Sequence, residues 1–237
     1  MSQKQTRWAI GVLGTSGVLT VIVLHWMVFF WVPTEATMGI VQRIFYIHVP
    51  AWWIAFLGFG IVGLCSAVFL WLGDERLDRA AVAAAEAGMV FTTIGLLTGP
   101  LWGRVAWGTW WEWEPRLTLA LILWFIYLGY FMVRRTAVNP EQGKRFAAVV
   151  GIIGVLDIPL IHVSVTWLRS LHPEAVILSA ENPMNLDGSM GATIGVGLLA
   201  FSLVFASLFL ARYTVAGYER ELDLRDATLA GTRAVEG

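Results

Sequence analysis

This 237-residue sequence contains one cysteine, Cys65, and only 14% of its residues are charged. A single cysteine excludes an internal disulfide, and the lack of C-x-x-C-H excludes a c-type cytochrome. Also absent are the phosphate-binding motif G-x-x-x-x-G-K-[ST], the zinc motif H-E-x-x-H and the nucleophile motif G-x-S-x-G. The net charge of −1 gives nucleic acid little to bind. We therefore predict that the chain is not an enzyme and has no nucleic-acid partner.

Apolar residues dominate the chain, at 57% of the sequence and a mean hydropathy of +0.69. Six apolar stretches of 17 to 25 residues cover 8–32, 51–72, 80–102, 117–133, 146–163 and 191–211. A helix rising about 1.5 Å per residue crosses a bilayer core of about 30 Å over such lengths. We predict an all-α integral membrane protein, with six transmembrane helices in one domain over residues 1–237. The first stretch lacks a cleavage site and is predicted to stay as a helix, while the charged tail after Tyr218 is predicted to be an exposed helix or a disordered end.

The Lys and Arg residues divide unequally between the two sides of this six-helix arrangement. One side holds twelve of them: Lys4, Arg7, Arg76, Arg79, Arg134, Arg135, Lys144, Arg145, Arg212, Arg220, Arg225 and Arg233. The other side holds Arg43, Arg104, Arg116 and Arg169. Because positively charged loops stay in the cytoplasm, we expect both termini there and the 107–113 segment outside.

Tryptophan is concentrated just after the third apolar stretch. Five of the thirteen tryptophans fall within twelve residues, at Trp102, Trp107, Trp110, Trp111 and Trp113. An interfacial belt normally places one or two rings at a helix end, so this density favours a platform for a large flat ligand. If the segment were helical, three of these rings would share one face with Glu114, although Gly108 and Pro115 favour a short or irregular helix.

Two of the four histidines lie on the tryptophan-rich side. His48 precedes Pro50, which suits a first helical turn, and His172 lies in the long loop after the fifth stretch. Neutral imidazole binds haem iron strongly, so this pair could clamp a porphyrin from both faces. The alternative for each is an interfacial hydrogen-bonding residue.

The other two histidines suggest a different site. His25 lies inside the first stretch and His162 closes the fifth, so a b-type haem held between two helices is an alternative. Asp157 also lies at membrane depth, where an ionisable residue is functional or paired, either with outer arginines or with a histidine.

Arginines on the outer side suit the carboxylates of a haem. Guanidinium binds carboxylate in a bidentate manner, and Arg116 and Arg43 lie nearest the tryptophan and histidine segments. Arg104 and Arg169 are further candidates. The alternative for each is a side chain that reaches to the lipid headgroups.

Three motifs together resemble the CcmC family of cytochrome c maturation, the haem exporter C proteins. Residues 107–118 (WGTWWEWEPRLT) are similar to its tryptophan-rich signature, although Glu114 stands where the family usually has Asp. Residues 46–52 (YIHVPAW) and 157–165 (DIPLIHVSV) resemble its two histidine regions. The resemblance implies that His48 and His172 are axial iron ligands and that the loop from Trp107 to Thr118, with Trp110, Trp111, Trp113, Glu114 and Arg116, cradles the porphyrin.

The resemblance also implies a task. The chain would hold haem b transiently at the outer face of a bacterial inner membrane and present it to the periplasmic chaperone CcmE, which forms the covalent bond. Its partners would be the lipid bilayer, CcmA, CcmB and CcmD, with the ATPase on a separate chain. A membrane cytochrome for electron transfer and a permease that moves haem through its own bundle are the alternatives.

Overall fold

A computed structural model of the chain describes residues 2–168, 172 and 188–236, with side chains in the last helix up to Asp226 except Asp223. Six helices in this part are long and apolar enough to cross a membrane. The elements are α1 (Gln3–Trp26), η1 (Met27–Trp31), η2 (Ile40–Ile44), α2 (Phe45–Leu72), α3 (Glu75–Ala106), α4 (Pro115–Thr136), α5 (Pro140–Trp167) and α6 (Gly188–Glu236). The prediction of an all-α, six-helix membrane protein is confirmed.

Several helices begin before the apolar stretch that predicted them, and polar caps set some of these ends. Gly73, at φ +68°, ends α2, and the Asp74 side chain then accepts a hydrogen bond from the Arg76 amide to start α3. Asn139 before Pro140 caps α5 in the same way. Hydropathy detects the apolar core of a helix and misses these capped ends.

The expectation that Pro50 lies in a first helical turn is wrong. The 3₁₀ turn η2 continues directly into α2, which begins five residues before Pro50. Pro50 therefore lies inside the helix, where it cannot donate to the Tyr46 carbonyl. At this point α6 approaches closely, because a Cβ added to Gly197 would lie 2.9 Å from the Pro50 ring and 3.0 Å from the Tyr46 carbonyl oxygen.

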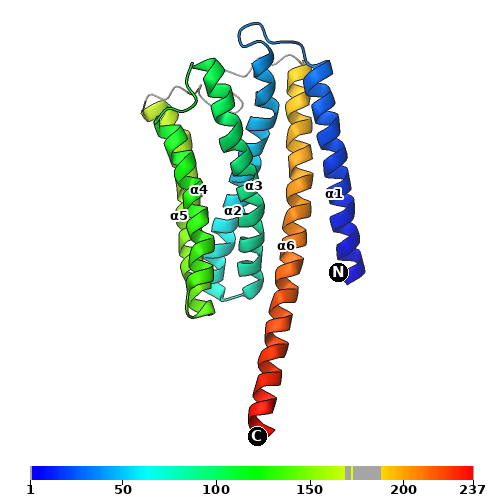
Figure 1. Cartoon of the computed structure of the whole chain (residues 1–237), viewed down its shortest axis with the longest axis vertical. Coiled ribbons are helices and arrows are strands. Elements are labelled where there is room, and N and C mark those ends of the chain that lie inside the picture. Colours follow the sequence, from blue (N-terminus) through cyan, green and yellow to red (C-terminus); the bar gives the residue numbers. More distant parts are fainter. Residues whose placement is uncertain (1, 169–171, 173–187, 237) are drawn as a thin grey trace.

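The helices form a row of pairs (Figure 1), with α4 and α5 at one edge, α2 and α3 in the middle, and α6 and α1 at the other edge. Close contacts join α2 of the middle pair to the α4–α5 pair. The rings of Phe59 in α2 and Tyr127 in α4 stack at 3.6 Å between centroids. A Cβ on Gly63 would lie 2.6 Å from the Val155 side chain, so this side chain of α5 packs directly on the α2 backbone, as small residues permit in membrane helices.

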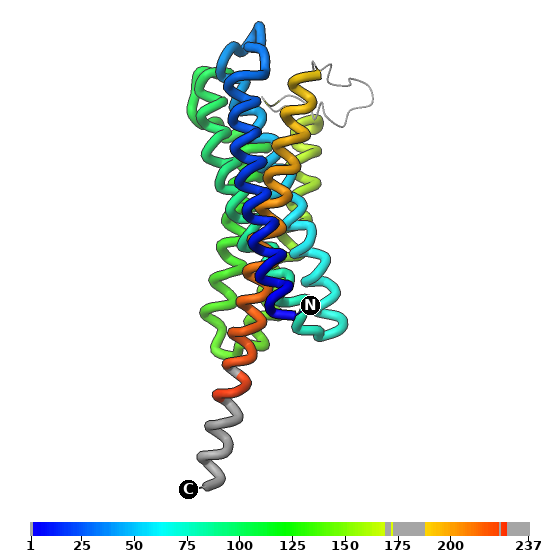
Figure 2. The backbone as a smooth tube through the Cα atoms, turned by 90° about the vertical axis from the view of Figure 1, so that its right-hand side faces the viewer, coloured from blue at the N-terminus to red at the C-terminus, as the bar shows by residue number. Residues whose placement is uncertain are grey.

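The two ends of the bundle differ in chemistry. The N-terminus, the α2–α3 turn, the α4–α5 turn and the extension of α6 lie at one end (Figures 1 and 2). There Arg134 holds Asp78 with two hydrogen bonds of 2.6 and 2.7 Å, which tie α4 to α3. The opposite end carries the 27–44 and 107–114 segments and His172. The distribution of Lys and Arg therefore predicted correctly which of these segments lie at the same end of the bundle.

Candidate functional site

A pocket opens at the tryptophan-rich end of the bundle. Its lining comes from α2, α3, α4, α5 and the connecting segments: His48, Trp52, Phe56, Gly95, Leu96, Gly99, Pro100, Trp107, Trp111, Arg116, Leu117, Ala120, Ile161 and His172. The walls are mainly apolar and aromatic, with two imidazoles and one guanidinium among them. An apolar lining with a few convergent polar groups is typical of a small-molecule site.

His48 reaches the pocket from the first turn of α2. Its Nδ1 atom lies 2.8 Å from the hydroxyl oxygen of Thr98 in α3. Its ring makes T-shaped contacts with the rings of Trp102 and Trp52, at 5.7 and 6.4 Å between centroids. The imidazole is therefore fixed by one polar contact and two aromatic ones, and its Nδ1 faces α3.

His172 enters the same pocket from the segment between α5 and α6. Its Nδ1 lies 3.1 Å from Glu114 Oε1, and its ring centroid lies 4.8 Å from that of Trp107. Burial and the nearby Arg116 guanidinium lower the pKa of His172 to about 4, although Glu114 acts in the opposite direction. His172 is therefore neutral at pH 7, the state in which imidazole binds metal ions.

One carboxylate oxygen of Glu114 accepts two hydrogen bonds. Its Oε1 accepts a hydrogen bond from the Leu117 amide at 3.0 Å, which caps the start of α4, and it also accepts from His172. The side chain is buried, with 9% of its surface exposed. Glu114 was predicted to contact a ligand, and the structure places it behind His172, as a group that orients the imidazole.

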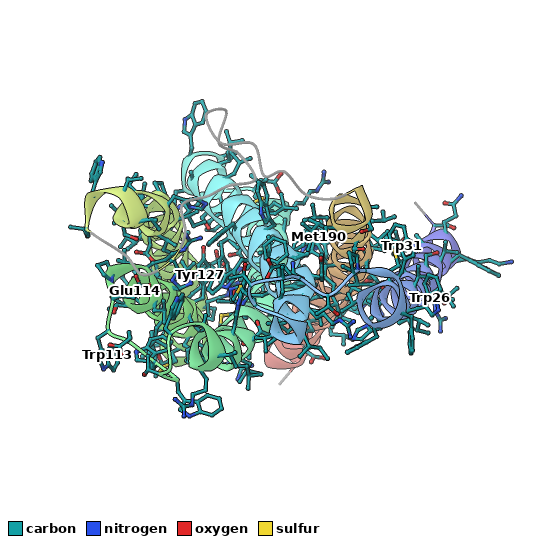
Figure 3. The ribbon with its side chains drawn as sticks, turned by 90° about the horizontal axis from the view of Figure 1, so that it is seen from above. Trp26, Trp31, Trp113, Glu114, Tyr127 and Met190 are labelled. Carbon is teal, nitrogen blue, oxygen red and sulfur yellow. The ribbon has the colours of Figure 1, made fainter. Side chains whose placement is uncertain are left out.

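The tryptophan-rich segment is not a helix. Trp107 caps the end of α3, and Gly108 at φ +81° turns the chain away, so the alternative of a single helical face over 107–114 is wrong. Trp107 and Trp111 line the pocket, whereas Trp110 and Trp113 have 58% and 74% of their surfaces exposed. Figure 3, which views the bundle from above, shows Trp113 at its outer edge.

The four candidate arginines have different surroundings. Arg116 lines the pocket from the first turn of α4. Arg43 lies 5.8 Å from the centroid of the Phe29 ring, apart from the pocket lining, and its buried Nε atom has no hydrogen-bond partner among the residues described. Arg104 donates to the Gly108 carbonyl, and Arg169 lies outside the described residues. Among the described candidates, Arg116 is thus the arginine that lines the same pocket as His48 and His172.

His25 and His162 do not form a second site. Each is exposed and places its Nδ1 near a backbone carbonyl of its own helix, at 2.8 Å from Val21 and 3.0 Å from Ile158. They belong to α1 and α5, at opposite edges of the row (Figure 1). A haem bridging this pair would require the two edges of the bundle to meet, so the geometry counts against the membrane cytochrome.

Asp157 is buried in α5, and its Oδ2 atom has no hydrogen-bond partner in the described part of the chain. Neither of the pairings expected for it, with an outer arginine or with a histidine, is found among the described contacts. It lies one helical turn from Ile161, which lines the pocket.

Some residues of the site were missed by sequence reasoning. Thr98 holds His48 across 50 residues of sequence, and Trp52 and Phe56 form one wall of the pocket. A threonine inside an apolar stretch resembles many others that bond only to their own helix, such as Thr92. Trp52 could have been inferred from its i, i+4 spacing to His48 on one helix face.

The fold and this pocket together define a six-helix membrane protein with a paired-histidine, tryptophan-walled site at one end of its bundle. Residues 1–228 match the family described as heme exporter protein C, CcmC. The heme exporter protein C of Bradyrhizobium diazoefficiens is 38% identical over 76% of this chain and 68% of that protein. The protein of the same name from Escherichia coli K12 is 35% identical over 86% of this chain and 82% of its own length. The chain belongs to the heme exporter protein C family.

Proposed function

We propose that this chain binds haem in the pocket, with His48 and His172 as the two axial ligands of the iron. One observation carries the proposal: two histidines from separate parts of the chain line the same aromatic pocket. Relatives named heme exporters support haem as the cargo. Paired histidine ligands favour low-spin iron.

The polar groups of the pocket fit the carboxylates of a haem. The Nε1 atom of Trp111 is buried and has no hydrogen-bond partner in the part of the chain that the structure describes. A buried donor without a partner is costly, so a ligand that accepts its hydrogen bond would be stabilised there. Arg116 lines the same pocket and supplies the matching positive charge. We assign these two residues to the propionates.

The apolar lining suits the porphyrin ring itself. Phe56, Leu96 and Pro100 offer non-polar contacts to a flat macrocycle, and Trp107 and Trp111 offer aromatic faces. We assign these tryptophans to the haem pocket. The exposed rings of Trp110 and Trp113 are assigned to contact with the protein that receives the haem, since exposed aromatic residues commonly anchor interfaces.

In the cell, the chain would hold haem b transiently at the outer face of the bacterial inner membrane and present it to the chaperone CcmE for cytochrome c maturation. The pocket lies at the end of the bundle opposite the positively charged turns, which supports cytoplasmic termini and an external site. CcmA, CcmB and CcmD are the proposed partners, with ATP hydrolysis on a separate chain. The role assigned to this chain is binding and release, without bond making.

A transfer assay tests this proposal. Purified haem-loaded protein in detergent is mixed with haem-free CcmE, and haem on each protein is measured after separation. Haem should pass to CcmE, and the double change Trp110→Ala with Trp113→Ala should reduce the transfer. His25→Ala is the matched control, since that ring bonds to its own helix, and it should leave transfer intact. If the wild type keeps its haem in the presence of CcmE and only cycles between oxidation states, it is an electron carrier instead.

A further inference from the structure

The Thr98 hydroxyl contacts more acceptors than it has protons. Its Oγ1 atom lies 2.7 Å from the Ile94 carbonyl oxygen, 3.2 Å from the Gly95 carbonyl oxygen and 2.8 Å from His48 Nδ1. A hydroxyl carries one hydrogen and two lone pairs, while a carbonyl oxygen only accepts. When the hydroxyl hydrogen is directed to the α3 backbone, the third contact has to be donated by the imidazole.

This arrangement of acceptors favours one tautomer of His48. If Nδ1 carried no hydrogen, it would face the Thr98 oxygen lone pair to lone pair at 2.8 Å, unless Thr98 gave up its backbone bond. With a hydrogen on Nδ1, the imidazole donates to the Thr98 oxygen while the hydroxyl donates to the α3 backbone. The neutral ring then carries its free lone pair on Nε2, which is the atom left to bind a metal ion.

We propose that Thr98 is the positioning residue of the His48 ligand: it holds the imidazole as the Nδ1–H tautomer, so that Nε2 is ready to bind haem iron. This inference rests on the proposed function, because it concerns the same site. Neighbours on α3 restrain the ring as well. Trp102 packs edge-on against it at 87°, and a Cβ on Gly99 would lie 3.4 Å from its Cε1 atom, so a larger residue at 99 would press on the imidazole.

The two histidines are held by different kinds of acceptor. Glu114 offers a carboxylate to His172, whereas Thr98 offers a neutral hydroxyl to His48. A carboxylate raises the basicity of the ligand more than a hydroxyl does. His48 is therefore the weaker electron donor of the pair, and the hydroxyl contact matters for its orientation more than for its charge.

The test compares Thr98→Val, which keeps the shape and removes the acceptor, with Thr98→Ser, which keeps the hydroxyl. Full-length protein is purified in detergent, haem is added, and the haem dissociation constant, the low-spin fraction and the thermal midpoint are measured. Thr98→Val should weaken haem binding by about 10- to 100-fold and add high-spin haem, as loss of a ligand's hydrogen-bond partner typically does. Thr98→Ser should restore both properties. Thr92→Val, which removes a hydroxyl bonded only to its own helix, should change neither.

A double-mutant cycle separates positioning from a merely structural effect. In a His48→Ala background, Thr98→Val should cause no further loss of haem binding, because its effect passes through the imidazole. If Thr98→Val binds haem as the wild type does, while His48→Ala loses it, the positioning role is wrong and the proposed haem site stands. If His48→Ala itself binds haem normally, the proposed site fails. Should Thr98→Val not fold, Thr98→Ala is measured in the same cycle, and an equal loss with and without His48 overturns the inference.

Discussion

The imidazole of His172 and the carboxylate of Glu114 are joined by a 3.1 Å contact across 58 residues of sequence. The same carboxylate oxygen caps the first turn of α4, so the start of that helix and the orientation of the histidine depend on one side chain. The segment that carries the tryptophans is thereby attached to the segment that carries the second proposed ligand. A change at Glu114 should consequently affect helix stability and haem binding together.

Glu114→Gln should separate these two effects. The amide oxygen can still accept from Leu117 and His172, so we expect near-normal stability but weaker haem binding, because the charge that raises imidazole basicity is lost. Glu114→Ala should also lower the free energy of unfolding by roughly 1 kcal/mol through loss of the cap. Thermal midpoints and haem titrations measure both quantities. Equal haem affinity in all three proteins would exclude a role for the carboxylate.

Arg116 and Arg43 form a matched pair, since only Arg116 lines the pocket. Arg116→Ala should reduce haem retention during purification, while the haem that remains should stay low-spin because the iron ligands are intact. Arg43→Ala should retain haem as the wild type does. Haem content per protein, read with the absorbance spectrum, gives the result. A larger loss from Arg43→Ala would place the propionates elsewhere.

Trp111 and Trp113 lie two residues apart with opposite exposure. Trp111→Phe removes a buried indole N–H that has no hydrogen-bond partner among the described residues, whereas Trp113 has 74% of its surface exposed. We expect Trp111→Phe to weaken haem binding and Trp113→Phe to leave it unchanged. Equilibrium titration of both variants decides the matter. The reverse order of affinities would contradict the assignment of Trp111 to the propionates.

The proposed orientation predicts which end of the bundle faces outward. In a Cys65→Ser background, a cysteine at Thr109 should react with a membrane-impermeant thiol reagent when the outer barrier of the cells is removed. A cysteine at Val138, which is fully exposed in the α4–α5 turn, should react only after lysis. Labelling in the opposite order would reverse the topology and put the pocket on the cytoplasmic side.

The spans were predictable from the sequence because burial in lipid demands long apolar runs, and all six were found. The ends of the helices were harder to predict. Pro50 was expected in a first helical turn, but η2 leads into α2 ahead of it. His48 and His172 could be singled out by their side of the membrane, but the support of His48 by Thr98 could not, because it joins α2 to α3 across 50 residues. Gly108 indicated a break in any helix over this segment, but the sequence could not show that Trp111 lines the pocket while Trp110 is exposed.

The most direct test of the account is the spectrum of haem bound to the wild type beside His48→Ala and His172→Ala. The wild type should show low-spin haem with two histidine ligands, and each alanine variant should show weaker binding or high-spin haem, because one axial bond is lost. His25→Ala, whose exposed ring bonds to its own helix, should match the wild type. Unchanged low-spin spectra in both the His48 and His172 variants would contradict the haem site described here.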